Sequence, residues 1–478
     1  MGRFKMVNMD RVGKISTVLL IASILAFSYF SYDTATKVQG TIGYVSDETW
    51  YVTSARNILR EIFNVQPSYV DSNGEYHYSL FFYNSYTRDN VRAELESFLK
   101  ERFDGRITMT YNNTAAYAIV TKKPLDRSLT MSSFDGIKII QSGYHYSDNN
   151  AIEHYLNTEH PPIVKYIIGL SMLTLGDYPI SWRIPSIIMG TLTFLLICLI
   201  VIKLTQQEIV AFIVVVCVFT DAVFKAMSSI GMLDIYVAFF LTLSAWLAIR
   251  GNYLLSGVAI GLATSAKLTG VFPAVALLFL LLILNFNLVK ALVYSIIVPF
   301  LVWVTTNLPM IVKWGVQGWF DTVINGLKWH VSPRPEGPPV STPWGWLYNE
   351  NPFPLHFNPD LAARVNPAIY LIAVLMLIFI PYLYAKGKSK YLVPAFWFGS
   401  TFLGYVTVYF LGNKTLYSFY VITLSPMAYV LTALAIYYLG EPSMFKDAIK
   451  FYYSYFRRII KRPEKATPIE QPDSKETL

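Results

Sequence analysis

The chain is poor in charged residues. Only 15% of its 478 residues are Asp, Glu, Lys or Arg, whereas 54% are hydrophobic, and the mean hydropathy is +0.40. Soluble domains carry roughly 25% charged residues. The shortage of charge therefore excludes an ordinary soluble protein and predicts an integral membrane protein with many spans.

Motifs built on cysteine or on glycine-rich loops are also scarce. The two cysteines, Cys198 and Cys217, lie inside apolar runs, so the sequence indicates neither a disulfide framework nor a cysteine zinc site. No glycine-rich phosphate loop is present, so no motif indicates that a nucleotide is bound. The absence of an internal repeat argues against the transporters that are built from inverted repeats.

The formal net charge of +8 does not indicate nucleic acid, because short basic clusters stand beside hydrophobic segments, as the positive-inside rule expects. Basic residues in positions 1–14 precede an uncharged run at 15–32. No small-residue cleavage site stands out, so we expect a retained first span with a cytoplasmic N-terminus.

The hydropathy pattern predicts an all-α polytopic membrane protein with about ten transmembrane helices. Residues 163–175 are too few for a comfortable crossing, which needs about 20 residues, so we interpret them as an interfacial helix. This choice places the loops 36–180 and 313–366 outside. The ten predicted crossings are 15–32, 181–204, 208–231, 233–250, 252–267, 269–286, 291–312, 367–385, 391–411 and 416–438.

The first outer loop contains a stretch of soluble composition, which predicts a small α/β insert. Strands are expected at 76–83, 107–111, 116–121 and 136–141, and an amphipathic helix at 89–103. The predicted divisions are 1–65 (first span and interfacial helix), 66–150 (insert), 151–312 (membrane core), 313–366 (outer loop rich in Trp and Pro), 367–440 (last spans) and 441–478 (basic cytoplasmic tail).

Two adjacent carboxylates, Asp47 and Glu48, stand where the chain leaves the membrane. Apolar residues recur at helical spacing after them, from Tyr51 to Ile62, which predicts a helix lying in the outer interface. An acidic residue in the first turn of a helix also serves as a cap and suits the helix dipole. Capping and catalysis are thus alternative interpretations of this pair.

Ionisable residues at membrane depth are costly and are therefore functional candidates. The predicted topology brings them to the outer face, under a loop rich in tryptophan. Cations there would hold the phosphate of an anionic, partly apolar substrate, and a carboxylate would act as a general base on a hydroxyl. The candidates are Asp47 and Glu48 as catalytic residues and His160, Lys165, Arg183, Asp234, Lys267, Lys414 and Trp344 as substrate-binding residues.

Each candidate also has a structural interpretation. Arg183 and Lys267 could snorkel to phospholipid head groups, and Asp234 could cap its helix. His160 stands before two prolines and could be a turn residue, and the tryptophans could be interface anchors. Asp221 and Lys225, four residues apart, are interpreted as a structural ion pair on one helix.

Five segments, in order, resemble the motifs of the polyprenyl-phosphate-sugar-dependent glycosyltransferases with the GT-C fold, most nearly the protein O-mannosyltransferases and the lipid A aminoarabinose transferases. The resemblance covers residues 41 to about 275. The matching segments are Asp47–Leu59, His160–Lys165, Ser181–Ser186, Met232–Asp234 and Ala266–Gly270. The insert at 66–150 is not part of this family pattern.

The resemblance implies an inverting transfer of mannose or a related hexose from a polyprenyl or dolichyl monophosphate to a protein, lipid or glycan hydroxyl. It assigns the general base to Asp47 and places Arg183 and Lys267 near the lipid phosphate, with Asp234 in the same cavity. Glu48 would support Asp47 or the acceptor site. A divalent metal is left open, since Asp47, Glu48, Asp234 and His160 offer ligands without a standard spacing.

Two other classes compete with this interpretation: a transporter or flippase of lipid-linked sugars, and a sensor or scaffold that binds through the insert. The charges lie mainly at helix ends rather than through the bilayer depth, which favours the enzyme. We expect a cell-membrane location with the site facing outside, membrane lipid as a partner and no nucleic-acid partner.

Overall fold

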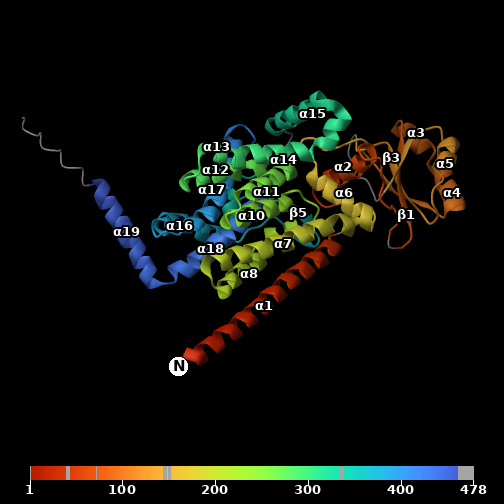
Figure 1. Ribbon diagram of the computed structural model, residues 1–478. Coiled ribbons are helices and arrows are strands. Elements are labelled where there is room, and N and C mark those ends of the chain that lie inside the picture. The colour runs from red at the N-terminus through yellow and green to blue at the C-terminus, as the bar shows by residue number, and fades with distance from the viewer. Residues whose placement is uncertain are drawn as a thin grey trace, which may run out of the picture.

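The computed structural model describes residues 2–38, 43–71, 73–143, 148, 152–332 and 339–460. The side chains of residues 2–14 and the tail beyond residue 460, which carry much of the predicted cytoplasmic charge, lie outside the described part. Figure 1 shows a body of packed helices with the sheet-containing segment at one end and α19 at the other.

The described chain is mostly helical. The helices are α1 (Gly2–Lys37), α2 (Glu48–Glu61), α3 (Ser85–Asn90), α4 (Arg92–Phe103), α5 (Arg127–Ser133), α6 (Ile163–Leu175), α7 (Pro179–Thr205), α8 (Ala211–Thr220), α9 (Ala222–Ser229), α10 (Asp234–Ile249), α11 (Tyr253–Ala266), α12 (Pro273–Ile283), α13 (Leu288–Leu292), α14 (Val298–Thr306), α15 (Leu308–Val331), α16 (Pro367–Ala385), α17 (Leu392–Phe410), α18 (Ser425–Leu439) and α19 (Pro442–Ile460). The strands are β1 (Tyr76–Phe82), β2 (Arg106–Thr110), β3 (Ala116–Thr121), β4 (Ile137–Ser142), β5 (Pro354–Phe357) and β6 (Asp360–Ala362).

The ten predicted crossings are not confirmed. Within the described ranges, five helices are long and apolar enough to span a membrane, or six if the bent pair α8–α9 forms one span. Four of the predicted crossings correspond instead to shorter apolar helices: α10, α11, the segment Leu268–Ile283, and α18. Helix α6 is also short, with 13 residues. The hydropathy pattern missed these lengths because it does not show where a helix breaks.

The core of the helical body is organised around α7, which packs against α1, α6, α9, α10 and α18. Close packing of α7 on α9 requires a glycine. A Cβ atom added at Gly190 would lie 2.2 Å from the Ser228 hydroxyl oxygen. The absence of a side chain therefore lets these two helices approach each other closely.

The bend between α8 and α9 is built around the buried carboxylate of Asp221. The helices meet at an angle of 70°, and Asp221 accepts hydrogen bonds from the hydroxyls of Tyr370 (2.9 Å) and Tyr429 (2.7 Å) and from the backbone N–H of Asn366 (3.1 Å). Lys225 is exposed and is not among these partners. The interpretation of Asp221 and Lys225 as an ion pair is therefore wrong: the carboxylate turns inward to join α16 and α18.

The chain between α2 and α6, which we call the sheet segment, contains a four-stranded antiparallel sheet. The strand order is β2-β3-β1-β4. The observed strands agree closely with the four that the sequence predicts. Leu95, Leu99 and Phe103 of α4 belong to the same buried cluster as Tyr78 and Leu80 of β1, so α4 covers one face of the sheet.

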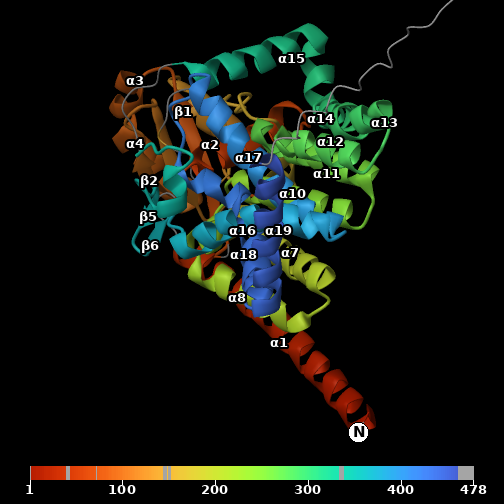
Figure 2. The ribbon, with the colours of Figure 1, turned by 90° about the vertical axis from the view of Figure 1, so that its left-hand side faces the viewer.

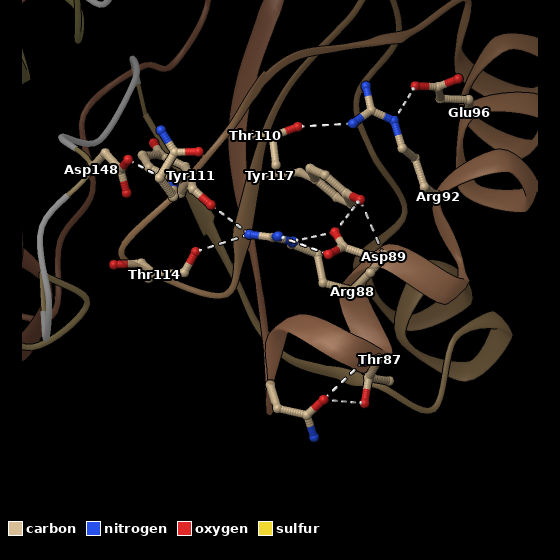
Figure 3. A network of polar contacts seen from close by, with 12 residues as sticks. Thr87, Arg88, Asp89, Arg92, Glu96, Thr110, Tyr111, Thr114, Tyr117 and Asp148 are labelled. Carbon is tan, nitrogen blue, oxygen red and sulfur yellow. Dashed lines mark hydrogen bonds and ion pairs between the residues drawn. The ribbon is translucent and has the colours of Figure 1, made fainter.

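Polar contacts tie α3 and α4 to the β2–β3 hairpin, as Figure 3 shows. Arg88 pairs with Asp89 (2.8 Å) and donates to the backbone carbonyls of Tyr111 and Thr114. The Tyr117 hydroxyl donates to Asp89. These contacts hold the helices of this segment on its sheet.

Helix α2 is braced to the helical body on two sides. Arg56 forms a bidentate ion pair with the buried carboxylate of Asp177 (2.6 and 2.7 Å). The side-chain amide of Asn57 donates to the backbone carbonyls of Ile152 and Tyr155 (2.8 and 2.9 Å), where the chain returns from the sheet. These contacts fix the direction of α2, and hence the position of the residues at its start.

Candidate functional site

The two adjacent carboxylates at the start of α2 have different environments. Asp47 is half-buried and lines an open cavity of about 610 Å³, which we call the Asp47 cavity. Glu48 is completely buried. Successive helical residues point about 100° apart around the axis, so one of the pair faces the cavity while the other faces the protein body.

Glu48 is paired with Arg183 of α7. The guanidinium donates to both carboxylate oxygens, with Nε–Oε1 at 2.8 Å and Nη2–Oε2 at 2.7 Å. Glu48 also accepts from the backbone N–H groups of Val45 and Gly231, and Arg183 donates to the carbonyls of Ala35 and Gly43. Arg183 is completely buried, and it is not among the residues that line the Asp47 cavity.

The Asp47 cavity has a lining rich in aromatic rings and carries two carboxylates, those of Asp47 and Glu159. Among the described residues, its lining includes no lysine or arginine. The remaining lining residues are Trp50, Tyr51, Tyr155, Asn157, Thr158, His160, Asn325, Gly326, Trp329, His330, Tyr417 and Tyr420. They come from α2, the return segment before α6, α15 and the segment before α18.

Tyr51 is influenced by two carboxylates that the sequence assigns to one site, Asp47 and Asp234. Its hydroxyl donates to Asp47 Oδ2 at 3.4 Å. Burial, followed by the negative charges of Asp47 and Asp234, holds the pKa of Tyr51 well above its usual value. The phenol therefore keeps its proton and acts as a hydrogen-bond donor next to Asp47.

Asp234 and Lys267 form a buried ion pair beneath this cavity. Lys267 Nζ lies 2.8 Å from Asp234 Oδ1 and 3.7 Å from the centre of the Tyr420 ring. Tyr420 itself lines the cavity. The pair thus lies behind the Tyr420 ring without lining the cavity itself, and we call it the floor of the site.

Two histidines meet on the cavity wall. The rings of His160 and His330 have their centroids 5.3 Å apart, and His160 also contacts Tyr51 and Trp329. A ring nitrogen of His330 lies 3.2 Å from the backbone oxygen of Glu159. The Glu159 carboxylate accepts from the Tyr155 hydroxyl and from the Asn157 amide (2.8 Å). The imidazoles are the cavity-lining groups that could become cationic next to a bound phosphate.

Lys165 supports the wall without lining the Asp47 cavity. Its buried ammonium donates to the backbone carbonyls of Asn157 (2.5 Å) and His160 (2.7 Å) and lines a smaller neighbouring cavity. The structure therefore places Lys165 as a brace for the return segment that carries Glu159 and His160, whereas the sequence predicted a substrate-binding residue.

Lys414 and Trp344 lie together, against one aromatic ring of α17. Both contact Tyr409: the Lys414 ammonium lies 3.6 Å from its ring centre, and Trp344 meets it edge-on at 5.3 Å. Neither residue lines the Asp47 cavity. Their substrate-binding role therefore stays a prediction.

Within the described ranges, no group of three or more His, Cys, Asp or Glu side chains is placed to hold a metal ion. Of the four suggested ligands, Glu48 is paired with Arg183 and Asp234 with Lys267. The two that line the cavity are Asp47 and His160.

Sequence reasoning missed several residues that line the cavity. Tyr51 and Glu159 had a signal, because Tyr51 lies inside a motif used for the family resemblance and Glu159 directly precedes another. Tyr155, Asn325 and Tyr420 had none, because helix α15 and the segment before α18 reach the cavity only through the fold.

Residues 159–310 match the family model described as dolichyl-phosphate-mannose-protein mannosyltransferase. A curated relative from Corynebacterium glutamicum, a polyprenol-phosphate-mannose–protein mannosyltransferase, is 25% identical over 365 aligned residues, which cover 58% of this chain and 70% of the relative.

Solved structures to which the chain is similar include ArnT from Cupriavidus metallidurans bound to undecaprenyl phosphate, with 14% identity, a TM-score of 0.43, and coverage of 62% of this chain and 53% of that one. Another is the Archaeoglobus fulgidus oligosaccharyltransferase tethered with an acceptor peptide, with 12% identity, a TM-score of 0.43, and coverage of 89% and 51%. The chain spans about half the length of these structures.

The matched family and the curated relative are both glycosyltransferases by name. The resemblance and the enzyme class that the motifs predict are thereby confirmed.

Proposed function

We propose that this protein transfers mannose or a related hexose from a polyprenyl monophosphate to a hydroxyl of a protein, lipid or glycan, at the outer face of the membrane. One observation carries the proposal: Asp47 stands at the wall of a cavity of about 610 Å³ that is lined with aromatic rings and floored by the Asp234–Lys267 pair. Aromatic faces suit sugar rings, and the open volume suits a sugar together with an acceptor side chain.

In the proposed reaction, Asp47 takes the proton of the acceptor hydroxyl. The hydroxyl oxygen attacks the anomeric carbon, and the bond from that carbon to the phosphate oxygen breaks. The electron pair leaves with the lipid phosphate, and a single displacement inverts the anomeric centre. The Tyr51 hydroxyl, 3.4 Å from Asp47 Oδ2, positions the carboxylate.

The lipid phosphate would lie against the two imidazoles of His160 and His330, which line the cavity. This arrangement modifies the role implied by resemblance for Arg183. Since Arg183 is buried and engaged with Glu48, we assign it to holding α2 on α7.

The test is Asp47→Asn, assayed in membranes with a radiolabelled polyprenyl-phosphate mannose. The variant keeps the shape of the side chain but removes the base, so transfer should fall by roughly 10²- to 10⁴-fold. Asp33→Asn is the matched control, because Asp33 pairs with Lys37 near the end of α1. Undiminished transfer by the Asp47 variant would remove it as the base, and no transfer by the unmodified protein would favour a transporter.

A further inference from the structure

A second cavity lies at the opposite ends of the helices that carry the floor of the site. Asp234 begins α10 and Arg250 follows its end; Lys267 follows the end of α11 and Tyr253 begins it. The 16 residues of α10 rise about 24 Å. The second cavity, which we call the Arg250 cavity, is therefore on the other side of the helical body from the Asp47 cavity.

The Arg250 cavity has a volume of about 120 Å³, which is room for about four water molecules. Its lining joins the ends of α10, α11, α12 and α17. Two cations, Arg250 and Lys390, share it with the hydroxyls of Tyr253 and Ser389, and the lining includes no carboxylate among the described residues. Gly251, with φ of +82°, turns the chain between α10 and α11 at its edge.

Neither of these two cations has an ion-pair partner within the described ranges. The Arg250 guanidinium lies over the Trp246 ring at 5.5 Å, which orients it without neutralising it. Lys386 pairs with Asp447, and Lys388 donates to the Tyr438 hydroxyl at 3.0 Å. Lys390, the lysine of this loop that lines the cavity, has neither an ion pair nor a side-chain hydrogen bond within the described ranges.

We propose that the Arg250 cavity binds the phosphate of an anionic lipid headgroup in the leaflet opposite the Asp47 cavity. Two unneutralised cations and two hydroxyl groups are suited to phosphate oxygens. Basic pockets between membrane helices bind such headgroups on the cytoplasmic side. This site is independent of the proposed sugar transfer and uses none of its residues.

The surroundings of the cavity favour a lipid over free phosphate. Leu280, Leu284 and Val393 form its apolar wall. Leu254 and Leu282 are exposed on the same helices, α11 and α12, and offer a surface for acyl chains. A free phosphate would leave this surface uncovered, whereas a lipid fills both parts.

The experiment measures lipid retention. The full-length protein is placed in nanodiscs of phosphatidylcholine and phosphatidylglycerol, extracted in detergent, and examined by native mass spectrometry. Arg250→Gln/Lys390→Gln should lower retained phosphatidylglycerol by roughly tenfold. Lys386→Gln/Lys446→Gln removes the same charge away from the cavity and should leave retention unchanged. Arg250→Lys keeps the charge and should retain most of the lipid.

Melting temperatures in pure phosphatidylcholine establish that each variant is folded. Equal retention by the cavity variant and the control would overturn the site, because general surface charge would then explain the binding. A second measurement adds inorganic phosphate at millimolar concentration and follows both the retained phosphatidylglycerol and the melting temperature. If the phosphate displaces phosphatidylglycerol and raises the melting temperature as much as the lipid does, the cavity is a soluble-phosphate site and the lipid proposal is wrong.

Discussion

At the scale of single residues, Asp47 and Glu48 are neighbours in the sequence but have different environments. The sequence presents them as one acidic motif, yet Asp47 lines the cavity and Glu48 is sealed against Arg183. Helical geometry separates neighbouring side chains, and no spacing rule shows which of the two turns inward. The pattern could therefore predict an acidic motif but not which carboxylate lines the cavity; it was the family resemblance that pointed to Asp47 as the base.

The buried Glu48–Arg183 pair yields a prediction about stability. Glu48→Leu or Arg183→Met alone should lower the free energy of unfolding by about 3–5 kcal/mol, because each leaves an uncompensated buried charge. The double variant Glu48→Leu/Arg183→Met should lose much less than the sum of the single losses. Thermal denaturation in detergent gives the stabilities, and transfer is compared per folded molecule.

Additive losses in that double-variant cycle would contradict the pairing. A second contradiction would be Arg183→Met variants that melt normally but need far more donor for half-maximal transfer. That result would return Arg183 to the phosphate site.

At the scale of elements, two helices from distant parts of the chain form the cavity. Helix α2 brings Asp47 and Tyr51, and α15 brings Asn325, Trp329 and His330. The helical spacing after Glu48 predicted α2 well, because an amphipathic face leaves a clear period. The sequence placed a crossing at 291–312 and a loop after it, whereas α14 ends at Thr306 and α15 runs from Leu308 to Val331 with a break in the helix at Gly315, whose φ is +74°. Figure 2 shows α15 lying along one edge of the body.

Gly326 lets α15 approach the return segment. A Cβ atom there would lie 3.0 Å from the Glu159 Cα atom. Gly326→Val should push α15 away from Glu159 and widen the cavity, and transfer should fall by about 10²-fold, the scale that a displacement of 1 Å can produce. Gly399→Val is the control, since a Cβ atom on that glycine of α17 meets nothing within 4 Å. Unchanged transfer by the Gly326 variant would show that this approach does not set the geometry.

At the scale of the whole molecule, the sequence predicted the membrane class and the strands of the sheet, but not the span lengths. Composition reports how much of the chain is apolar, which suffices for the class. It does not report breaks such as the 70° bend at Asp221, because the tyrosines that hold that carboxylate come from α16 and α18. Interactions of this long range arise only once the helices pack.

The placement of charge predicts which end of the molecule is cytoplasmic. Arg250, Lys386, Lys388 and Lys390 gather at the end opposite the Asp47 cavity, and the positive-inside rule assigns that end to the cytoplasm. The sheet segment follows α2, at the cavity end, and the two ends lie on opposite sides of the body in Figure 1. The proposed reaction at the outer face needs this orientation, because the acceptor must reach Asp47 from outside.

Cysteine labelling tests the orientation directly. The native cysteines are buried, so their background should be low. In intact cells, a membrane-impermeant maleimide should label Tyr86→Cys, whose parent side chain is 77% exposed on α3, and should label Lys390→Cys only after permeabilisation. Labelling of Lys390→Cys in intact cells, with Tyr86→Cys protected, would turn the Asp47 cavity toward the cytoplasm. The acceptor would then have to be a cytoplasmic one, since the cavity and the sheet segment share one end of the molecule.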